Sequence, residues 1–400
     1  MITVSFDPKR NTFVHARPEL GHLFWGADDE LVHNVKGEEI QEEWTLHFQE
    51  KRKRLGPLVG ILCGKMKSGE LMGNRRLFMN LQNELQESGG VSFLFTLEDC
   101  FDHYIEGTCY IPLKKKWIRS TFPLPNIIYN RLPSRLGEKE QSFIQFKEKM
   151  KQKTLSFFNP SYIDKFSLYS LFSKHKTLSS LLPPTILIDN DASILDAFLS
   201  EHTDLYIKPT SSSQGNGIKR IKKSSFDMVH VTTAKKEVSF PTFEAFWKHH
   251  QSDSRFTSFL AQKTIESRLL NGRKFDYRIL SHYHKGRYLL TGIGIRVAKE
   301  NGLTTHVPRG GTLYPYKELQ NPDLDKQFEW IANECGKALT KEYGFFGEFT
   351  LDVGEDKDGK LWLYEVNAKP MAFDEKDIEE NKIKSLSRLF HELTHTLYNR

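Results

Sequence analysis

Apolar and polar positions follow two rhythms in the first part of the chain. Residues 57–64 form an unbroken apolar run, PLVGILCG, which is typical of a strand buried on both faces. Residues 76–90, RLFMNLQNELQESGG, place apolar side chains at helical spacing and end at a glycine pair that would stop a helix. Residues 91–97, VSFLFTL, form a second apolar run. This strand, helix, strand order predicts an open α/β domain.

The pattern divides the chain into three expected units. Short alternating runs, ITVSF at residues 2–6 and NTFVHA at 11–16, are broken by Asp-Pro and predict a small β-rich lobe over residues 1–52. We expect the α/β domain over residues 53–158. The remaining unit, residues 159–400, contains no low-complexity linker and no internal repeat.

A buried strand is predicted near the end of the α/β domain. Residues 122–135, FPLPNIIYNRLPSR, read as an apolar strand followed by a polar turn that contains proline. Arg131 and Arg135 of this turn either face a cleft between domains or are exposed arginines.

The third unit begins with a helical pattern at residues 164–181, followed by a strand, LPPTILI. Residues 204–221, DLYIKPTSSSQGNGIKRI, predict two strands joined by a Gly/Ser loop, with Lys208 near the end of the first strand. The next runs predict a strand at residues 258–265, charged antiparallel strands at 272–302 and a helix at 323–342.

The segment with the most candidate functional residues is 347–370, GEFTLDVGEDKDGKLWLYEVNAKP. It predicts two strands joined by a polar turn. Alternation places Glu365 and Asn367 on one face of the second strand, opposite Trp362, Tyr364 and Val366. A hairpin would bring Asp352 to the face of Glu365 and Asn367. Carboxylate and amide oxygens are the ligands that Mg²⁺ prefers, so this face is a candidate metal site, with Mn²⁺ as an alternative ion.

Two other interpretations explain this segment less well. Asp356, Asp358, Gly359 and Glu365 have the spacing of an EF-hand calcium loop, but its first position is Gly354, which has no side-chain oxygen, and the flanks are strand-like. An ordinary hairpin with a KDG turn explains the turn residues and leaves the polar residues of the aromatic strand unexplained.

Composition narrows the class of protein. The chain is 38% hydrophobic and 12% aromatic, which indicates folded domains with real cores. No apolar run approaches the ~20 residues of a membrane span, and no secretory pattern opens the sequence, so we expect a soluble protein made inside the cell. The four cysteines show no CxxC spacing, which disfavours a disulfide framework or a zinc site.

The net charge of +6 is mildly basic and includes clusters such as Lys114–Lys116. Such runs are usually solvated; they allow an acidic partner or a phosphate ligand and do not by themselves indicate nucleic acid. The Gly/Ser loop is a weak signal as well. Its glycines would let backbone amides approach phosphate oxygens, but the loop matches neither GxxxxGK[ST] nor GxGxxG in a strand-to-helix setting, and such loops are often only turns.

The order of these features resembles the ATP-grasp superfamily. The carrying segments are YIKPTSSSQGNGI, FDYRIL, and GEFTLDV with LWLYEVNAKP, and the resemblance covers about residues 160–395. Together with IIYNRLPSR, the whole chain resembles the YheC/YheD group of ATP-grasp proteins, which is associated with the bacterial endospore coat. The implied fold is α/β (α+β), with two α+β lobes clasping ATP, lobe one at about residues 159–263 and lobe two at about 264–400.

The resemblance implies a role for individual residues. Lys165 and Lys208 match lysines that contact ATP phosphates, although Lys165 is also explained as a surface lysine. Asp352, Glu365 and Asn367 match the Mg²⁺ ligands. The loop that would fold over the triphosphate contains Ser212, Ser213, Gly215 and Gly217. The segment that would meet adenine and ribose contains Gln262, Lys263, Ile265 and Glu266.

Further matches concern the substrates. Arg278 and Arg296 lie where family arginines bind phosphate or the acyl phosphate, and Gly310-Gly311 falls where a glycine pair lines the substrate cleft. His306 replaces an Asn that many members carry four places before this pair. Lys369 is either a contact to the acceptor or a solvated lysine.

The implied chemistry is ATP-dependent ligation of a carboxylate to an amine or thiol through an acyl phosphate. The implied partners are ATP, a carboxylate substrate, an amine acceptor and spore-coat proteins, with cytoplasmic synthesis and a location at the coat or forespore. No Ser/His/Asp or Cys/His nucleophile has a convincing context. Two alternatives stay open: a coat protein that keeps the fold without turnover, and phosphorylation of a small substrate.

Overall fold

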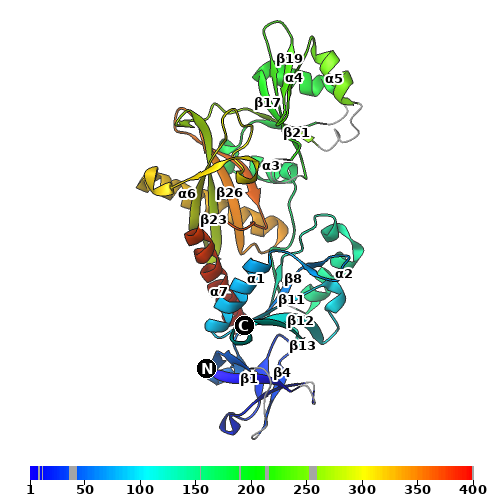
Figure 1. Ribbon diagram of the computed structural model, residues 1–400, viewed down its shortest axis with the longest axis vertical. Helices are drawn as coiled ribbons and strands as arrows, with labels where there is room; N and C mark the ends of the chain where they lie inside the picture. Colours follow the sequence, from blue (N-terminus) through cyan, green and yellow to red (C-terminus); the bar gives the residue numbers. More distant parts are fainter. Residues whose placement is uncertain are drawn as a thin grey trace.

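The computed structural model describes residues 1–7, 10, 12–35, 43–153, 155–188, 191–211, 216–251 and 259–398. The molecule is elongated, and its sheets succeed one another along the long axis (Figure 1). The N-terminal sheet lies at one end, next to the α/β sheet, and the sheet that contains β17 and β19 lies at the other end.

The N-terminal sheet has the strand order β5-β1-β2-β4-β3-β7-β6. Its strands are β1 (Ile2–Asp7), β2 (Thr12–His15), β3 (Leu23–Trp25), β4 (Glu30–Asn34), β5 (Glu43–Leu46), β6 (Phe48–Gln49) and β7 (Arg54–Leu55). Trp25 and Trp44 are buried in one cluster with Phe93 and Phe122 of the next sheet. The N-terminal lobe therefore shares its core with the α/β domain; the boundaries at residues 52 and 158 stay predictions.

The predicted strand, helix, strand order of the α/β domain is present. β8 (Leu58–Leu62) pairs in parallel with β11 (Val91–Phe95), and α1 (Arg75–Glu87) connects them. The side chain of Asn74 caps α1 by accepting a hydrogen bond from the Leu77 amide. The sheet is completed by β12 (Tyr104–Ile111), β13 (Lys116–Pro123), β14 (Ile127–Asn130) and β15 (Ser156–Phe158), with α2 (Gln141–Gln152) nearby.

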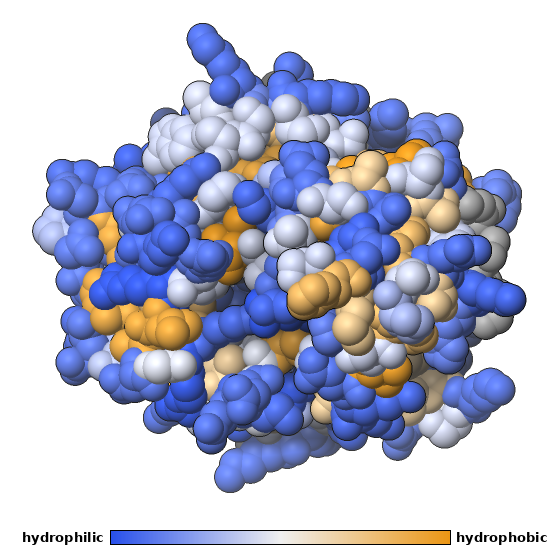
Figure 2. Space-filling model, turned by 90° about the horizontal axis from the view of Figure 1, so that it is seen from above, coloured by the Kyte–Doolittle hydropathy of each residue, from blue (hydrophilic) through white to orange (hydrophobic). Residues whose placement is uncertain are grey.

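Lobe one is an antiparallel sheet with one face covered by helices. Its strands are β16 (Thr185–Ile188), β17 (Asp204–Pro209), β18 (Lys219–Lys223), β19 (Val229–Thr232), β20 (Glu237–Phe240) and β21 (Phe259–Lys263). Leu195 of α4 (Ala192–His202) and Phe246 of α5 (Phe243–Gln251) pack on Leu205 and Ile221 of the sheet. Seen from this end of the molecule, the surface is largely hydrophilic with separate apolar patches (Figure 2).

Lobe two contains the predicted hairpin. Its antiparallel sheet has the order β25-β24-β23-β26-β27, with β22 (Leu269–Leu270) paired to β23. The strands are β23 (Arg273–His284), β24 (Arg287–Val297), β25 (Thr312–Tyr314), β26 (Glu348–Glu355) and β27 (Leu361–Asn367). Helix α6 (Pro322–Tyr343) packs its buried Phe328 and Ile331 against this sheet.

The hairpin contains a bulge that the alternation pattern did not predict. Asp352 pairs with Glu365, but Val353 pairs with Leu363, so Tyr364 is the extra residue. Val366 faces the core as expected, together with Leu361 and Leu363. The prediction that Trp362 and Tyr364 share the face of Val366 is wrong, because the bulge exchanges the faces at this point. The strands on both sides of the turn also exclude the EF-hand.

Helix α7 (Lys376–Tyr398) joins lobe two to the α/β domain and runs beside α1 (Figure 1). Its Leu386 and Phe390 are buried in one cluster with Val59, Leu81 and Tyr129. None of the helices in the described ranges has the length and apolar character of a membrane span. The four cysteines are free thiols.

Candidate active site

The predicted metal ligands meet on the paired strands of lobe two. Asp352 and Glu365 are directly opposite each other on β26 and β27, and Asn367 follows two places later on the same face. All three line a cavity of about 860 Å³ between lobe two and the α/β domain. The prediction that the hairpin brings these three side chains to one face therefore agrees with the geometry.

Arg296 holds Asp352 in place. Its guanidinium forms two 2.9 Å hydrogen bonds to the carboxylate of Asp276 and a 3.0 Å ion pair with Asp352 Oδ2. Burial alone would raise the pKa of Asp352, but the positive charges of Arg296 and then Arg278 outweigh this effect and hold the pKa below its usual value. Asp352 is therefore a carboxylate at neutral pH.

The donor set fits a divalent cation. Oδ1 of Asp352 is buried and has no hydrogen-bond partner among the described residues, whereas its other oxygen is bound to Arg296. A buried carboxylate oxygen without a partner is costly unless a ligand satisfies it. The described residues contain no group of three or more His, Cys, Asp or Glu suited to a metal. The site would instead bind the cation with the two carboxylates of Asp352 and Glu365 and the amide of Asn367. These three ligands would leave coordination positions for phosphate oxygens and water.

Two lysines approach the carboxylates from lobe one and from the segment before it. Lys165 is the first residue of α3 (Lys165–Ser173), and its Nζ lies 2.6 Å from Oε1 of Glu365. The alternative that Lys165 is a surface lysine is therefore wrong. Lys208, on β17, donates a 2.5 Å hydrogen bond to Gln262. Burial lowers the pKa of Lys208 to about 8.

A second, narrower cavity of about 130 Å³ lies beside these lysines. Gln262 and Lys263, at the end of β21, and Ile265 line it together with Tyr364, which the bulge turns toward this side. The structure does not bring Glu266 into either cavity. Glu266 is exposed and forms a 2.7 Å ion pair with Lys357.

The Gly/Ser loop is only partly placed. Ser212, Ser213 and Gly215 lie outside the described residues. Gly217 adopts a positive φ of 76°, and a Cβ there would lie 2.8 Å from the Pro209 ring, so the return of the chain toward β18 favours glycine.

Arg278 lines the larger cavity with a guanidinium that has few partners. Its Nε is buried and makes no hydrogen bond within the described residues, while the guanidinium carbon lies 5.1 Å from the centre of the Phe373 ring. Arg278 is directly opposite Asp352 on the neighbouring strand. Unlike Arg296, it is available to an anionic ligand.

His306 contacts Arg296, with 3.3 Å between Nδ1 and the guanidinium. Burial, followed by the charge of Arg296, lowers the pKa of His306. The ring is therefore neutral and can accept this hydrogen bond. Gly310 and Gly311 close the adjacent turn, where a Cβ on Gly311 would lie 2.2 Å from the Thr305 carbonyl oxygen. The glycine pair is not part of either cavity wall, whereas His306 lines both.

The α/β domain contributes the opposite wall of the larger cavity. Arg131 and Arg135 both line this cavity, which supports the cleft interpretation. Arg131 forms a 3.3 Å ion pair with the fully buried Glu348. Arg135 donates a 2.9 Å hydrogen bond to the Ile163 carbonyl group. Their position at the cleft follows from β14, which ends immediately before Arg131.

Lys369 is not solvated, so that alternative is wrong. Its ammonium forms a buried ion pair with Glu138 and donates a 3.2 Å hydrogen bond to the Leu132 carbonyl group. Burial lowers the pKa of Lys369 to about 8. Lys369 nevertheless lines the larger cavity, so contact with an acceptor stays a prediction.

Sequence reasoning left several site residues unassigned. Asp276 binds Arg296 and accepts a 2.6 Å hydrogen bond from Thr305. It precedes Arg278 by two positions, so strand alternation alone could have placed both on one face. Glu138 and Glu375 carried no recognisable motif.

Comparisons with known proteins show the family of this chain and its fold. A family model described as YheC/D like ATP-grasp matches residues 154–394. The chain is 28% identical over 362 residues to the endospore coat-associated protein YheD of Bacillus subtilis (strain 168), covering 85% of this chain and 77% of that protein. It is 22% identical over 287 residues to YheC of the same organism, covering 66% and 76%.

Among solved structures, the crystal structure of the D-cycloserine synthetase DcsG is similar, with a TM-score of 0.51 and 14% identity over 83% of this chain and 99% of that chain. This similarity shows the fold alone. Because the family model covers more than half of the sequence, the chain belongs to the YheC/D-like ATP-grasp family and has an α+β ATP-grasp fold.

Proposed function

We propose that the protein is an ATP-dependent ligase that activates a carboxylate as an acyl phosphate and joins it to an amine. A thiol acceptor is the variant of the same chemistry that the sequence leaves open. The observation that carries the proposal is Oδ1 of Asp352, which has no hydrogen-bond partner in the described part of the chain and lies opposite Glu365 in a cavity that Arg278 also lines. A metal ion, the phosphates of ATP and the substrate carboxylate would bind next to one another in this cavity.

The proposed role of each residue follows from its charge. Lys165 and Lys208 would bind the phosphates of ATP, and Asp352, Glu365 and Asn367 would hold Mg²⁺, which supplies charge stabilisation to the transferring phosphoryl group. Gln262, Lys263 and Ile265 would border the adenine. Arg278 would hold the anionic substrate, since its guanidinium lies in the cavity wall without an ion pair among the described residues.

Arg296 has a different role in this proposal. Its guanidinium is committed to Asp276 and Asp352, so it orients the carboxylate at the metal position. The sequence assigned Arg278 and Arg296 similar tasks, and their contacts support a division between substrate binding and positioning. Preorganised charges of this kind supply most of the catalysis in phosphoryl and acyl transfer.

The relatives named as endospore coat-associated proteins suggest where the protein acts. We propose the same association here, with an amino acid, a peptide or a coat protein as acceptor. A purely structural coat protein is the second candidate. The buried, unpartnered oxygen of Asp352 disfavours it, because a scaffold gains nothing from that unsatisfied atom.

Calorimetric titration of ATP with Mg²⁺ tests the nucleotide site. We expect the wild type to bind, Lys208→Ala to bind at least about tenfold more weakly, and Glu365→Gln to lose its dependence on Mg²⁺. Asp358→Asn, in the exposed turn of the same hairpin, is the matched control and should behave as wild type. A well-folded wild type that does not bind ATP would refute the ligase proposal.

A screen for substrates then tests turnover. ADP release is measured with a panel of carboxylates, and each carboxylate that stimulates it is incubated with amino acids, peptides and thiols. Mass spectrometry distinguishes the outcomes. A ligase yields an amide or thioester plus phosphate, a kinase yields a stable phosphorylated product, and a structural protein yields neither.

A further inference from the structure

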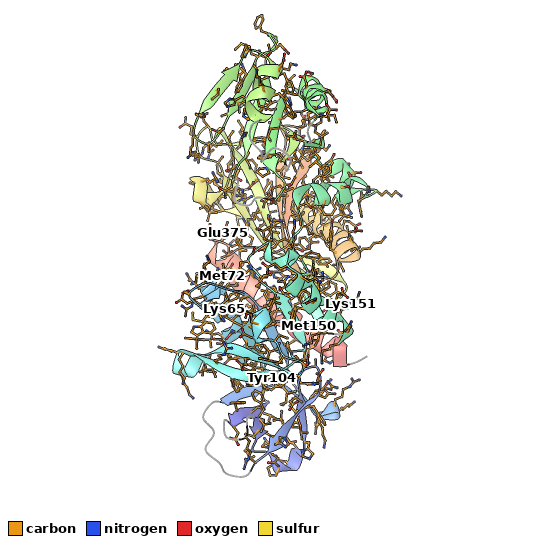
Figure 3. The ribbon with its side chains drawn as sticks, turned by 90° about the vertical axis from the view of Figure 1, so that its right-hand side faces the viewer. Lys65, Met72, Tyr104, Met150, Lys151 and Glu375 are labelled. Carbon is orange, nitrogen blue, oxygen red and sulfur yellow. The ribbon has the colours of Figure 1, made fainter. Side chains whose placement is uncertain are left out.

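Glu375 is a charged side chain in the larger cavity to which the proposed function gives no task. It is partly buried and lines the cavity; among the described residues its carboxylate forms no ion pair and accepts a hydrogen bond from its own backbone amide. Figure 3 shows Glu375 where lobe two meets the α/β domain, on the same side of the molecule as Met72. Burial raises the pKa of Glu375 above its usual value.

Two glycines of β24 determine where Glu375 lies. Gly292 and Gly294 are two positions apart and therefore face the same side of the sheet. A Cβ on Gly292 would lie 2.4 Å from Ile378 Cγ2, and a Cβ on Gly294 would lie 2.4 Å from Glu375 Oε1. The start of α7 thus packs against a part of β24 where the two glycines leave no side chains. This brings the Glu375 carboxylate close to the sheet.

This position is beside the expected acyl phosphate. Gly294 is directly opposite Arg278, and Arg278 is directly opposite Asp352 on the next strand. Glu375 therefore lies over β24, two strands from Asp352, which is about 10 Å at the usual strand spacing. A substrate held between Asp352 and Arg278 would present its carbonyl carbon toward Glu375.

The chemistry of the surroundings selects the kind of group that binds Glu375. The charged neighbours that act on it most are Asp374, Asp377 and Arg278, so two of the three repel its negative charge. The described residues around it hold no cluster suited to a metal. A cation with hydrogen-bond donors would compensate a partly buried carboxylate, and the ammonium form of an acceptor amine is such a group. A thiol would gain nothing there.

We propose that Glu375 binds the acceptor amine. This inference rests on the proposed ligase function and deepens it: the acceptor is a primary amine, not a thiol, and its ammonium group pairs with Glu375 beside the activated carboxylate. The ammonium gives a proton to the Glu375 carboxylate, and the neutral amine then attacks the carbonyl carbon of the acyl phosphate as phosphate leaves and takes up the second proton. Arg278 holds the anionic donor, and Glu375, just before α7, holds the cationic acceptor over the adjacent strand β24. Arg278 and Glu375 would then determine where the donor and the acceptor bind in the cavity.

The test compares two nucleophiles with one donor carboxylate taken from the substrate screen. Hydroxylamine is uncharged at neutral pH and traps an acyl phosphate as a hydroxamate, so it does not need Glu375. Methylamine is an ammonium at neutral pH and does need it. We expect Glu375→Gln to raise the KM for methylamine about 10- to 100-fold and to leave hydroxamate formation within about twofold of wild type.

Glu380→Gln is the matched control, because Glu380 is exposed on α7 and lines neither cavity. It should leave both reactions unchanged. Gly294→Ala is a second variant that should displace Glu375 and raise the same KM. Circular dichroism verifies that each variant is folded.

Three results would overturn the assignment. An unchanged KM for methylamine in Glu375→Gln would exclude amine binding. An equal loss of both reactions would assign Glu375 to donor activation instead, and faster thioester than amide formation by the wild type would contradict the choice of acceptor. Failure of the proposed function is distinguishable, since the wild type would then form no hydroxamate with any carboxylate and the inference would fall with it.

Discussion

Arg296 and Asp352 form a buried ion pair in which one oxygen of the aspartate is bound and the other has no hydrogen-bond partner among the described residues. The Nη2–Oδ2 distance is 3.0 Å, and both residues are 4% exposed. Asp276 completes the arrangement with two hydrogen bonds to the same guanidinium. The arginine therefore determines which Asp352 oxygen remains for a ligand.

Replacing Arg296 should destabilise the fold strongly. Arg296→Ala leaves Asp276 and Asp352 as buried carboxylates without their partner, which typically costs about 3–5 kcal/mol. Urea unfolding monitored by circular dichroism measures the loss.

Arg278→Ala is the control for this experiment. Arg278 lines the same cavity from the neighbouring strand but has no ion pair among the described residues, so its removal should cost less than about 1 kcal/mol. Equal destabilisation by the two substitutions would contradict the different roles assigned to the two arginines.

ATP binding should weaken as the pH rises above about 8. The pKa of Lys208 is lowered to about 8 by burial, so its ammonium is charged below that pH and loses its charge above it. We expect the affinity to fall by up to tenfold per pH unit in this range. Calorimetry between pH 7 and 9.5 measures the slope. Lys208→Arg should bind with little dependence on pH, and a wild-type affinity that stays constant would refute the role of Lys208.

Glu348 should make the fold sensitive to acid. Burial would raise its pKa, but the charges of Lys382 and Arg131 and the nearby His282 ring, whose Nε2 lies 3.6 Å from Glu348 Oε2, outweigh burial and lower the pKa to about 2. A carboxyl group with a depressed pKa stabilises the folded state above its ordinary pKa near 4.5, and this contribution is lost between pH 4.5 and 2.

Glu348→Gln tests this point. It should lower the free energy of unfolding by roughly 3 kcal/mol at pH 7, because Arg131 and Lys382 lose their buried partner. It should also flatten the dependence of stability on pH between 4.5 and 2. Glu342→Gln, an exposed site on α6, is the comparison. A variant as stable as wild type at pH 7 would show that the buried cluster contributes nothing.

Lys369 and Glu138 should prove mutually dependent. Lys369→Met leaves a buried carboxylate and should cost about 3–5 kcal/mol, whereas the double variant Lys369→Met/Glu138→Gln should recover a large part of that loss. Thermal unfolding of the single and double variants measures the coupling. If the two costs simply add, the pair is not a structural unit.

The sequence was sufficient for the elements whose apolar pattern is local. The parallel strands around α1, the strand that carries Lys208 and the pairing of Asp352 with Glu365 each follow from runs of fewer than about 40 residues. The bulge at Tyr364 could not be predicted, because it depends on how β27 fits against β26 and the core beneath them. Its effect was to exchange the faces expected for Trp362 and Tyr364.

Contacts between distant segments account for the other differences. Lys369 was expected either to contact an acceptor or to be in solvent; the structure excludes solvent, because its partner Glu138 lies 231 residues earlier in the chain. Glu266 was expected near the ribose, yet its strand ends at Lys263 and Lys357 holds it at the surface. Asp276 could have been found, since it shares a strand face with Arg278.

The packing of α7 on α1 has a consequence for the order of folding. Ser88 bonds to His391 across 303 residues, and Leu386 completes the apolar cluster that Val59 and Leu81 begin. During synthesis the early strands of the α/β domain leave the ribosome long before this helix exists. The face of these strands that α7 covers then stays exposed until α7 is made. The nascent chain should therefore be most prone to aggregation just before that point.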